Sequence, residues 1–435
     1  LEIIPEKVPG KLSGLDALLD ELSSLVDLDE DDREAFHKSR NNYRVFDSVP
    51  LKFNLSEREV ARLAVNRHRL QGVDVVPYLS RHYPYGELLT HVLGYTGRLD
   101  ADDISSVDEG NYRGTRTIGK IGIEKSHEKE LHGISGFERV ETNVRGRELK
   151  VLEREDAIPG TDLVLSLDVA VQRAAWDALG DRPGSVVAID PVDGSVIALV
   201  SKPAYDPNAF VGGISQKAYN DILNAPGRPL FNRALNGAYE PGSTLKPFVG
   251  LAGLELELVT PETRVFSNGK FYIEGYDRPY RDWKDGGHGW VDMHGALEQS
   301  VNTYFYQLAM DMGIDRMHDY LSQFGFGSVT GIDVPGEGKG LLPSRQWKRA
   351  VHDLPWYPGE TVIAGIGQGF NVVTPLQLAN AVTALVNGGT RYSPRLLYAA
   401  KPAGIERAKR IKAPVEFEVP IRDPRDWQVI LDGMD

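Results

Sequence analysis

The chain of 435 residues contains no cysteine. This absence excludes disulfide bonds, thiolate metal sites and a cysteine nucleophile. No basic tract occurs and the net charge is −13, so long-range electrostatics opposes nucleic acid as a partner. Apolar runs never approach the roughly 18 residues that a membrane span requires. The chain opens within a strand-like pattern at Leu1–Pro5, and we expect a natural N-terminus ahead of it.

Apolar residues make up 41% of the chain, which is enough for large buried cores, and the length predicts two or three domains. Leucines at helical spacing predict short polar helices within residues 11–39. Ser56 and Glu59 fit a capping box at the start of the next helix. Between residues 118 and 151 glycines recur among charged residues, and we predict extended strands joined by tight turns there.

Pro159-Gly160 marks the predicted boundary between two domains. After it, the pattern predicts a strand over 163–168 and an amphipathic helix over 169–179. Two apolar runs on either side of Asp193-Gly194 predict a β-hairpin. The region from 243 to 387 is predicted to be mostly helical. Strand pairs followed by a helical block favour an α+β fold over alternating βαβ units.

The most informative segment contains Ser243 and Lys246. Pro241-Gly242 breaks the chain, and the apolar spacing that follows predicts a helix starting near Ser243. Pro247 is compatible with that helix because it falls in the first turn, where backbone N–H groups lack helical partners. Ser243 and Lys246 then share one helix face. Burial and the positive helix end favour a neutral lysine amine, which is able to take the proton of the serine hydroxyl.

A Ser-x-x-Lys pattern also arises by chance. Ser126–Lys129 is such a match, without a preceding turn and in a charged stretch. Ser300 and Asn302 add a hydroxyl and a carboxamide at a predicted helix junction, where the first can relay a proton and the second can hold a peptide group. Taken alone, this second pattern fits an ordinary helix cap equally well.

Taken together, these segments resemble the class B penicillin-binding proteins, and most closely the elongation-type group called penicillin-binding protein 2. The resemblance covers nearly the whole chain. Its segments are, in chain order, Arg81–Pro84, Ile121–Glu124, Asn143–Arg147, Asn232–Ala234, Pro241–Pro247, Tyr280–Lys284, Ser300–Asn302 and Gly365–Gly369.

The resemblance implies a strand-rich, non-catalytic pedestal domain of the dimerisation type over residues 1–160. A penicillin-binding transpeptidase domain, an antiparallel sheet flanked by helices, is expected over 161–435. In this family a serine attacks the D-Ala-D-Ala carbonyl of a peptidoglycan stem peptide and releases the terminal D-Ala. An amine of a neighbouring stem then resolves the acyl-enzyme, which makes the cross-link of the growing cell wall.

Carried onto this chain, the family pattern makes Ser243 the nucleophile and Lys246 its base. Ser300 becomes the proton relay, and Asn302 a contact to the substrate and the proton network. β-Lactam antibiotics are expected to acylate Ser243, because they imitate the dipeptide. No cofactor is implied.

Partners and location follow from the same resemblance. We expect a SEDS-family membrane glycan polymerase and other proteins of the elongation complex to bind the pedestal. We also expect a single N-terminal anchor in the bacterial inner membrane, absent from this chain, with the catalytic domain in the periplasm.

Two further segments bear on ligands. Gly367, Gln368 and Gly369 are weak evidence for a phosphate-binding loop, because the next helix begins only at Thr374–Gln377. We expect these three residues to line the substrate cleft. Asp282 and His288 lie where some relatives build a zinc site with a further Asp and a Cys. Ser267 and Val301 occupy those two places here. Two ligands do not make a closed site, so we expect no metal.

The third family motif, Lys-Ser/Thr-Gly on a late strand, is missing from this sequence. Either the chain is truncated or the sequence omits segments of the natural protein, and we expect the C-terminal strands that carry the motif to be missing with it. That strand helps to form the oxyanion hole, and losing one donor typically costs roughly 3–4 kcal/mol of transition-state stabilisation. We therefore expect a polypeptide ending at Asp435 to be nearly inactive, and the complete protein to be active.

Two alternatives remain at this stage. A serine β-lactamase or β-lactam sensor shares the catalytic fold, but normally lacks such a pedestal, and no dedicated deacylating base is evident. A catalytically silent scaffold that activates a glycan polymerase fits the missing third motif. The intact set of Ser243, Lys246, Ser300 and Asn302 argues against the scaffold.

Overall fold

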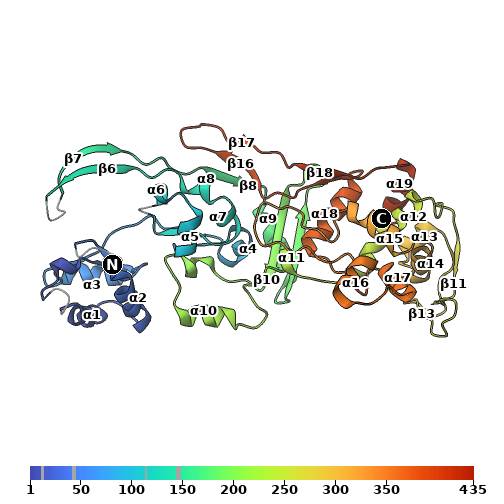
Figure 1. The fold of residues 1–435 in the computed structure, drawn as a ribbon, viewed down its shortest axis with the longest axis horizontal. Helices are drawn as coiled ribbons and strands as arrows, with labels where there is room; N and C mark the ends of the chain where they lie inside the picture. The colour runs from blue at the N-terminus through green and yellow to red at the C-terminus, as the bar shows by residue number, and fades with distance from the viewer. Residues whose placement is uncertain (11–13, 42–45, 113–114, 144–147) are drawn as a thin grey trace.

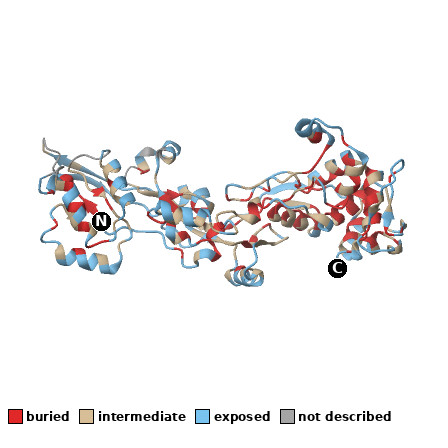
Figure 2. Cartoon of the chain, turned by 90° about the horizontal axis from the view of Figure 1, so that it is seen from below, coloured by how far each residue is buried: buried red, intermediate tan, exposed pale blue. Residues whose placement is uncertain are grey.

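The structure is a computed structural model that describes residues 1–10, 14–41, 46–112, 115–143 and 148–435. Within the resembling segment Asn143–Arg147, residues 144–147 lie outside the described ranges. The chain is elongated, with an N-terminal lobe at one end and a large helical lobe at the other (Figure 1). Buried residues concentrate in the helical lobe and, separately, around the N-terminus (Figure 2).

The N-terminal lobe has its own small core. β1 (Glu2–Ile3) pairs antiparallel with β2 (Val49–Pro50) and with β3 (Val73–Asp74). The predicted polar helices are confirmed as α1 (Leu15–Ser23) and α2 (Glu30–Arg40), which bury their leucines and Phe36 against this sheet. The predicted capping box is confirmed as well: Ser56 and Glu59 cap α3 (Glu57–Asn66) reciprocally.

The next part of the chain contains both helices and strands. Its elements are α4 (Thr90–Leu93), β4 (Thr96–Arg98), α5 (Ala101–Ser106), α6 (Glu109–Tyr112), β5 (Thr117–Gly119), α7 (Gly122–Ser126), α8 (Glu128–His132), β6 (Phe137–Thr142) and β7 (Glu148–Glu155). β4 pairs with β5, and β6 pairs with β7 in a long hairpin that projects from this part of the chain (Figure 1).

The prediction of strands throughout 118–151 is wrong for residues 122–132, which form α7 and α8. Gly122 and Gly133 both have positive φ, at 62° and 78°. Gly122 is the first residue of α7, and Gly133 lies just past α8, where glycine is common. The two glycines therefore mark the ends of this helical stretch instead of turns between strands. Ile123 and Glu124 are buried between the two glycines, so burial selects the helix.

The centre of the molecule is an antiparallel hairpin, as predicted around Asp193-Gly194. β9 (Gly184–Ile189) pairs with β10 (Val196–Lys202). The predicted helix is α9 (Val169–Leu179), which packs on this hairpin together with α11 (Arg233–Asn236) and α18 (Pro375–Val386). β8 (Asp162–Leu165) pairs with β16 (Leu397–Lys401), late in the chain. The expected antiparallel sheet flanked by helices is thus confirmed.

The helical lobe surrounds α12 (Lys246–Glu255), whose residues Phe248–Leu254 are all buried. It contacts α13 (Met293–Glu298), α14 (Asn302–Met312), α15 (Ile314–Gln323) and α19 (Pro424–Asp432). Two small hairpins cover one side: β11 (Val265–Ser267) pairs with β14 (Gly289–Val291), and β12 (Lys270–Phe271) with β13 (Tyr280–Arg281). The remaining elements are α10 (Gln216–Leu223), α16 (Arg345–His352), α17 (Pro358–Ala364), β15 (Thr390–Tyr392), β17 (Lys409–Arg410) and β18 (Val415–Glu418).

The predicted start of α18 is confirmed. Thr374 accepts a hydrogen bond from the N–H of Gln377, and Pro375 opens the helix. The side-chain nitrogen of Gln377 lies within hydrogen-bond distance of the carbonyl oxygens of Gly325, Ser328 and Lys339, and its two N–H groups tie the helix start to neighbouring loops.

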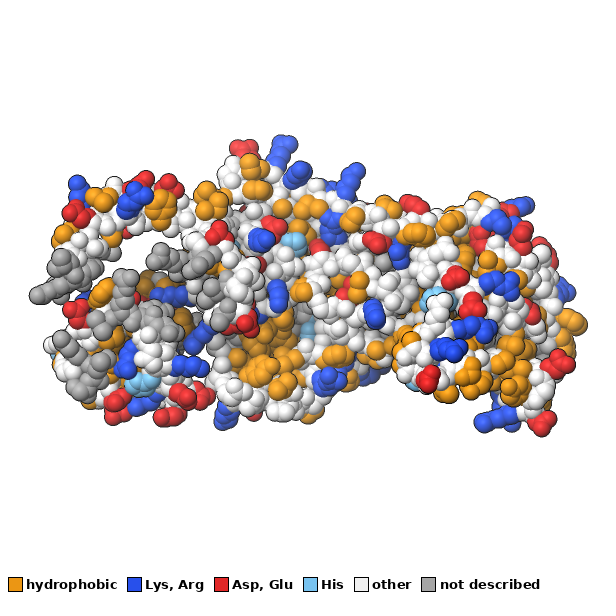
Figure 3. Space-filling view, viewed as in Figure 1, with side chains coloured by type: hydrophobic (Ala, Val, Ile, Leu, Met, Phe, Trp, Pro, Cys, Tyr) orange, Lys and Arg blue, Asp and Glu red, His pale blue; other side chains and the backbone are white. Residues whose placement is uncertain are grey.

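Two further properties concern membrane-spanning helices and surface charge. No helix in the described ranges is both long and apolar enough to cross a membrane. On the face shown in Figure 3, the acidic and basic side chains of the described residues are interspersed and form no continuous basic surface.

Candidate active site

The turn before α12 presents Ser243. Gly242 adopts a left-handed conformation with φ +57°, which a side chain disfavours. A 3₁₀ turn over Gly242–Leu245 follows, and the α-helix proper begins at Lys246 with Pro247 in its first turn. The predicted helix start near Ser243 is confirmed, with a tighter first turn than expected. Ser243 is exposed, and within the described part of the chain its side chain makes no hydrogen bond.

Lys246 lies one helical turn further and is 1% exposed. Burial lowers its pKa from 10.5 to about 8, because the charged ammonium loses its hydration, and the carboxylate of Asp282 opposes this by raising the pKa. The ring of Phe305 lies beneath the amine, with Nζ 5.5 Å from the ring centroid. A lysine with a pKa near 8 holds a substantial neutral fraction at physiological pH, as a general base requires.

Three oxygens surround the Lys246 amine. Nζ lies 2.8 Å from the carbonyl oxygen of Ser300, 2.7 Å from Oδ1 of Asn302 and 3.0 Å from Oγ of Ser300. The carbonyl and amide oxygens only accept hydrogen bonds, so they take the two N–H groups of a neutral amine. The lone pair is then left for a hydroxyl, and Ser300 Oγ is the one in contact. The geometry fits a neutral amine that exchanges a proton with a serine hydroxyl.

Ser300 itself has a strained backbone. Its φ is +51°, a left-handed value that non-glycine residues seldom adopt. It occupies the junction between α13 and α14, where its N–H donates to the carbonyl of Leu297 and its own carbonyl accepts from Lys246. Strain of this kind costs of order 1–3 kcal/mol and persists where neighbouring contacts impose it. Here the contacts with Lys246 hold the turn that presents the Ser300 hydroxyl.

The structure therefore brings Lys246, Ser300 and Asn302 into direct contact and places exposed Ser243 one turn before the lysine. The sequence pattern predicted that these residues share one site. The left-handed backbone of Ser300 had no signal in the sequence.

The Gly365–Gly369 loop packs against the serine turn. The N–H of Gly242 donates to the carbonyl of Gly367 at 2.8 Å, and the N–H of Gly369 donates to the Glu240 carboxylate at 3.0 Å. A Cβ on Gly367 would lie 2.2 Å from the Gly242 carbonyl oxygen, so only glycine fits. Gln368 is exposed beside this contact. The sequence predicts this loop as lining of the substrate cleft but carries no signal for its direct support of the serine turn.

The predicted candidates for a metal site do not form one. His288 Nε2 lies 3.4 Å from Oδ1 of Asp282, and His288 Nδ1 lies 3.1 Å from the amide oxygen of Gln299. The hydroxyl oxygens of Ser267 and Thr303 lie 2.7 Å apart, and the Thr303 hydroxyl also lies 3.1 Å from Oδ2 of Asp282. Because the carboxylate only accepts, Thr303 donates to Asp282 and accepts from Ser267. Among the described residues no group of three or more His, Cys, Asp or Glu side chains is placed to hold a metal ion. The donor set does not fit a tetrahedral zinc site.

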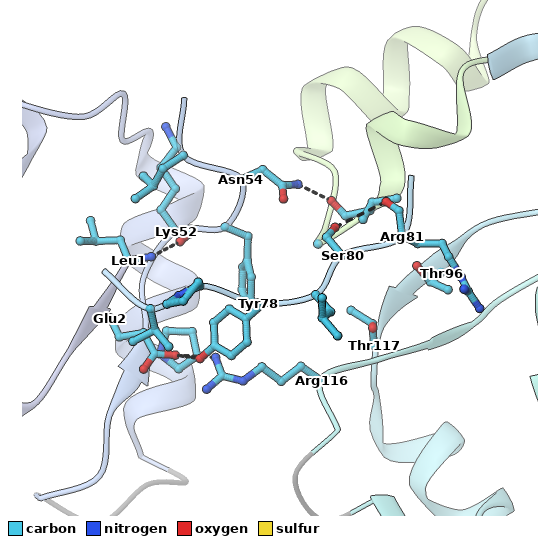
Figure 4. Close-up of a pocket in the computed structure, with 18 of the residues that line it drawn as sticks. Leu1, Glu2, Lys52, Asn54, Tyr78, Ser80, Arg81, Thr96, Arg116 and Thr117 are labelled. Atoms are coloured by element: carbon cyan, nitrogen blue, oxygen red, sulfur yellow. Dashed lines mark hydrogen bonds and ion pairs between the residues drawn. The ribbon is translucent and has the colours of Figure 1, made fainter. Parts of the chain in front are cut away.

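A cavity of about 760 Å³ lies elsewhere, between the N-terminal lobe and β5 (Figure 4). Its basic side chains are already paired: Arg116 with Glu2 at 2.6 Å and Arg81 with Glu124 at 2.8 Å. None of its lining residues belongs to the serine site. The cavity lies at a junction between lobes, and apolar side chains make up more of its lining than polar ones.

Comparison with known families agrees with this geometry. Residues 184–434 match the family model described as penicillin binding protein transpeptidase domain, and residues 1–165 match the penicillin-binding protein dimerisation domain. The peptidoglycan D,D-transpeptidase MrdA of Escherichia coli K12 is 42% identical, over 100% of this chain and 68% of the relative.

Two solved structures are similar over most of this chain. PBP2 of Pseudomonas aeruginosa, in complex with WCK 5153, is 43% identical with a TM-score of 0.70, and the match covers 85% of this chain and 77% of that one. PBP2 of Helicobacter pylori, in complex with MreC, is 28% identical with a TM-score of 0.80, and the match covers 96% of this chain and 77% of that one.

Proposed function

This chain belongs to the penicillin-binding proteins with a transpeptidase domain, and we propose that Ser243, Lys246, Ser300 and Asn302 carry its reaction. It is a peptidoglycan D,D-transpeptidase that cross-links stem peptides through a serine acyl-enzyme. The observation that supports this residue assignment is the buried amine of Lys246, held by Ser300 and Asn302 one turn from an exposed serine.

In the acylation step, Ser243 Oγ attacks the carbonyl carbon of the penultimate D-Ala. Its proton passes to the neutral amine of Lys246, directly or through the Ser300 hydroxyl, and the carbonyl oxygen becomes an oxyanion. Collapse of this intermediate breaks the peptide bond, and the proton moves to the departing amino group of the terminal D-Ala. The backbone N–H groups at the positive helix end favour the oxyanion.

In the second step, an amine of a neighbouring stem peptide attacks the acyl-ester carbonyl. Lys246 accepts a proton from that amine, and the ester bond to Ser243 Oγ breaks. The serine oxygen recovers a proton by the same route, so the enzyme returns to its starting state. Asn302 keeps the lysine in place through both steps, since its amide oxygen accepts from Nζ at 2.7 Å.

The site also accounts for inhibition. A β-lactam carbonyl placed at Ser243 is attacked in the same manner, but its leaving group stays tethered to the acyl-enzyme. Gly367, Gln368 and Gly369 line the approach to Ser243, because the loop bonds to the turn at Gly242. We assign these three residues to substrate binding on that contact.

The remaining assignments concern the whole protein. We propose a pedestal over 1–160 and a catalytic domain over 161–435, with the strand pair β8–β16 tying the boundary region to the catalytic part. PBP2 of Helicobacter pylori binds MreC, and we propose that this pedestal binds a protein of that kind. We further propose a SEDS-type glycan polymerase as a partner, inner-membrane anchorage and a periplasmic catalytic domain during elongation.

Labelling with a fluorescent penicillin tests the nucleophile. In the full-length protein, Ser243→Ala is expected to abolish covalent labelling because it removes the nucleophile. Within the described ranges the serine hydroxyl in contact with Lys246 is that of Ser300, which is held as its partner. Ser126→Ala is the matched control, since Ser126–Lys129 has the same spacing outside this site, and it is expected to label normally. Persistent labelling of Ser243→Ala would overturn the assignment.

A further inference from the structure

Asp282 is a buried carboxylate that the reaction described above does not use. It directly follows β13, and its side chain is 0% exposed. Oδ2 accepts hydrogen bonds from the backbone N–H of Thr303 at 2.9 Å and from the Thr303 hydroxyl at 3.1 Å, and Oδ1 accepts from the N–H of Trp283 at 2.8 Å. These contacts fix the carboxylate in one orientation.

Thr303 lies in the first turn of α14, where backbone N–H groups have no partner within the helix. The N-cap residue of α14 is Val301, whose side chain offers no hydrogen-bond acceptor. Asp282 supplies the missing oxygen from a separate part of the chain. Its negative charge also lies at the positive end of the helix dipole, where it is stabilising. Asp282 thus caps α14 from outside.

The two residues that hold the amine of Lys246 belong to this capped segment. Asn302 is the first residue of α14, adjacent to Thr303, and Ser300 lies just before the helix with its strained backbone. We propose that Asp282 is a positioning residue of the transpeptidase, which caps α14 at Thr303 and thereby keeps Ser300 and Asn302 in register with Lys246. This inference rests on the proposed function of Lys246 as the base.

The charge of Asp282 has a second, separable effect. It raises the pKa of Lys246 against the larger lowering by burial. The other titratable groups that face Asp282 are His288, with Nε2 at 3.4 Å, and Tyr306 of α14, whose pKa is raised to about 12 by burial and by Asp282. Neither is an anion near neutral pH. Removal of the carboxylate charge is therefore expected to lower the pKa of Lys246.

The test is Asp282→Asn in the full-length protein, with the saturating rate of acylation by a fluorescent penicillin measured from pH 6 to 9.5. An amide has one acceptor oxygen, so it cannot keep the bonds of both carboxylate oxygens to Trp283 and Thr303. We expect the plateau rate to fall by about tenfold, on the scale of a lost helix cap and buried hydrogen bond. The midpoint of the pH profile moves to lower pH.

Thr303→Val separates the positioning of α14 from the effect of the Asp282 charge on the pKa of Lys246. It also replaces Asp282→Asn as the test if that variant folds poorly. It removes the hydroxyl bond but keeps the carboxylate charge and the backbone cap, so the plateau rate falls less and the midpoint stays at its wild-type pH. Thr303→Ser keeps the hydroxyl and is expected to restore the wild-type plateau.

Asp168→Ala is the control for a cap without this role. Oδ1 of Asp168 caps α9, accepting from the N–H groups of Ala170 at 2.7 Å and Val171 at 3.1 Å, in a helix that packs on β9 and β10. Because alanine offers no acceptor, Asp168→Ala is expected to lower the melting temperature without changing the acylation profile. The inference is overturned if Asp282→Asn behaves like Asp168→Ala, with a lower melting temperature and an unchanged plateau and midpoint. Labelling of Ser243→Ala reports separately on the proposed function.

Discussion

The pKa of Lys246 makes a quantitative prediction about the pH dependence of acylation. Burial lowers this pKa from 10.5 to about 8, and at about 1.4 kcal/mol per pKa unit the difference is worth about 3 kcal/mol toward the neutral amine. At pH 7 a lysine with a pKa of about 8 is roughly one tenth neutral, whereas an ordinary lysine is neutral in roughly three molecules per ten thousand. The site thus gains a factor of about 300 in available base.

The measurement is the saturating acylation rate of the full-length protein with a fluorescent penicillin between pH 6 and 9.5. Raising the pH removes the proton from Lys246, so the rate is expected to increase about tenfold per pH unit well below pH 8 and to level off above it. Lys246→Arg supplies the control, because a guanidinium stays protonated over this range. Its rate is expected to be at least about a thousandfold lower and nearly independent of pH. A flat wild-type profile, or the same profile in Lys246→Arg, would refute Lys246 as the base.

Two further predictions concern the turns around the lysine. Ser300→Ala and Ser300→Gly both remove the relay hydroxyl, but only glycine tolerates a φ of +51° without strain. Thermal unfolding is therefore expected to show Ser300→Gly more stable than Ser300→Ala by about 1 kcal/mol. Equal stabilities of the two variants would show that the backbone of Ser300 is unstrained. Gly367→Ala forces a Cβ to 2.2 Å from the Gly242 carbonyl oxygen and is expected to slow acylation at least about tenfold. Gly388→Ala, at φ +78° with no atom within 4 Å of the new Cβ, carries backbone strain alone and is expected to acylate normally.

Local sequence signals predicted the elements that local contacts determine. The capping box of Ser56, the helix over 169–179 and the hairpin around Asp193-Gly194 depend on residues close together in the chain, and all are present. The prediction failed at 122–132, because the glycines at both ends were interpreted as turns between strands. Burial of Ile123 and Glu124 decided that region, and burial depends on packing that a short window of sequence does not contain.

The features of the site also divide into those that local sequence predicts and those that depend on distant contacts. The spacing of Ser243 and Lys246 is a property of one helix start, so it was readable directly. The contact of Gly367 with Gly242 and the cap from Asp282 to Thr303 join segments far apart in the chain. Val301 as an N-cap without a polar side chain was the available signal, since a helix start of that kind requires an acceptor from elsewhere.

The low pKa of Lys246 and the stability of the helical lobe have a common origin. α12 is buried on all sides, and the same packing that forms the core around Phe248 and Phe305 strips water from the lysine amine. A buried amine destabilises the fold unless its hydrogen bonds are satisfied, and Ser300 and Asn302 satisfy them. Both residues stand at the start of α14, so the partners of the amine are only as fixed as that helix start. The geometry of the base therefore depends on how α14 is capped, and the carboxylate of Asp282 supplies that cap from outside the helix.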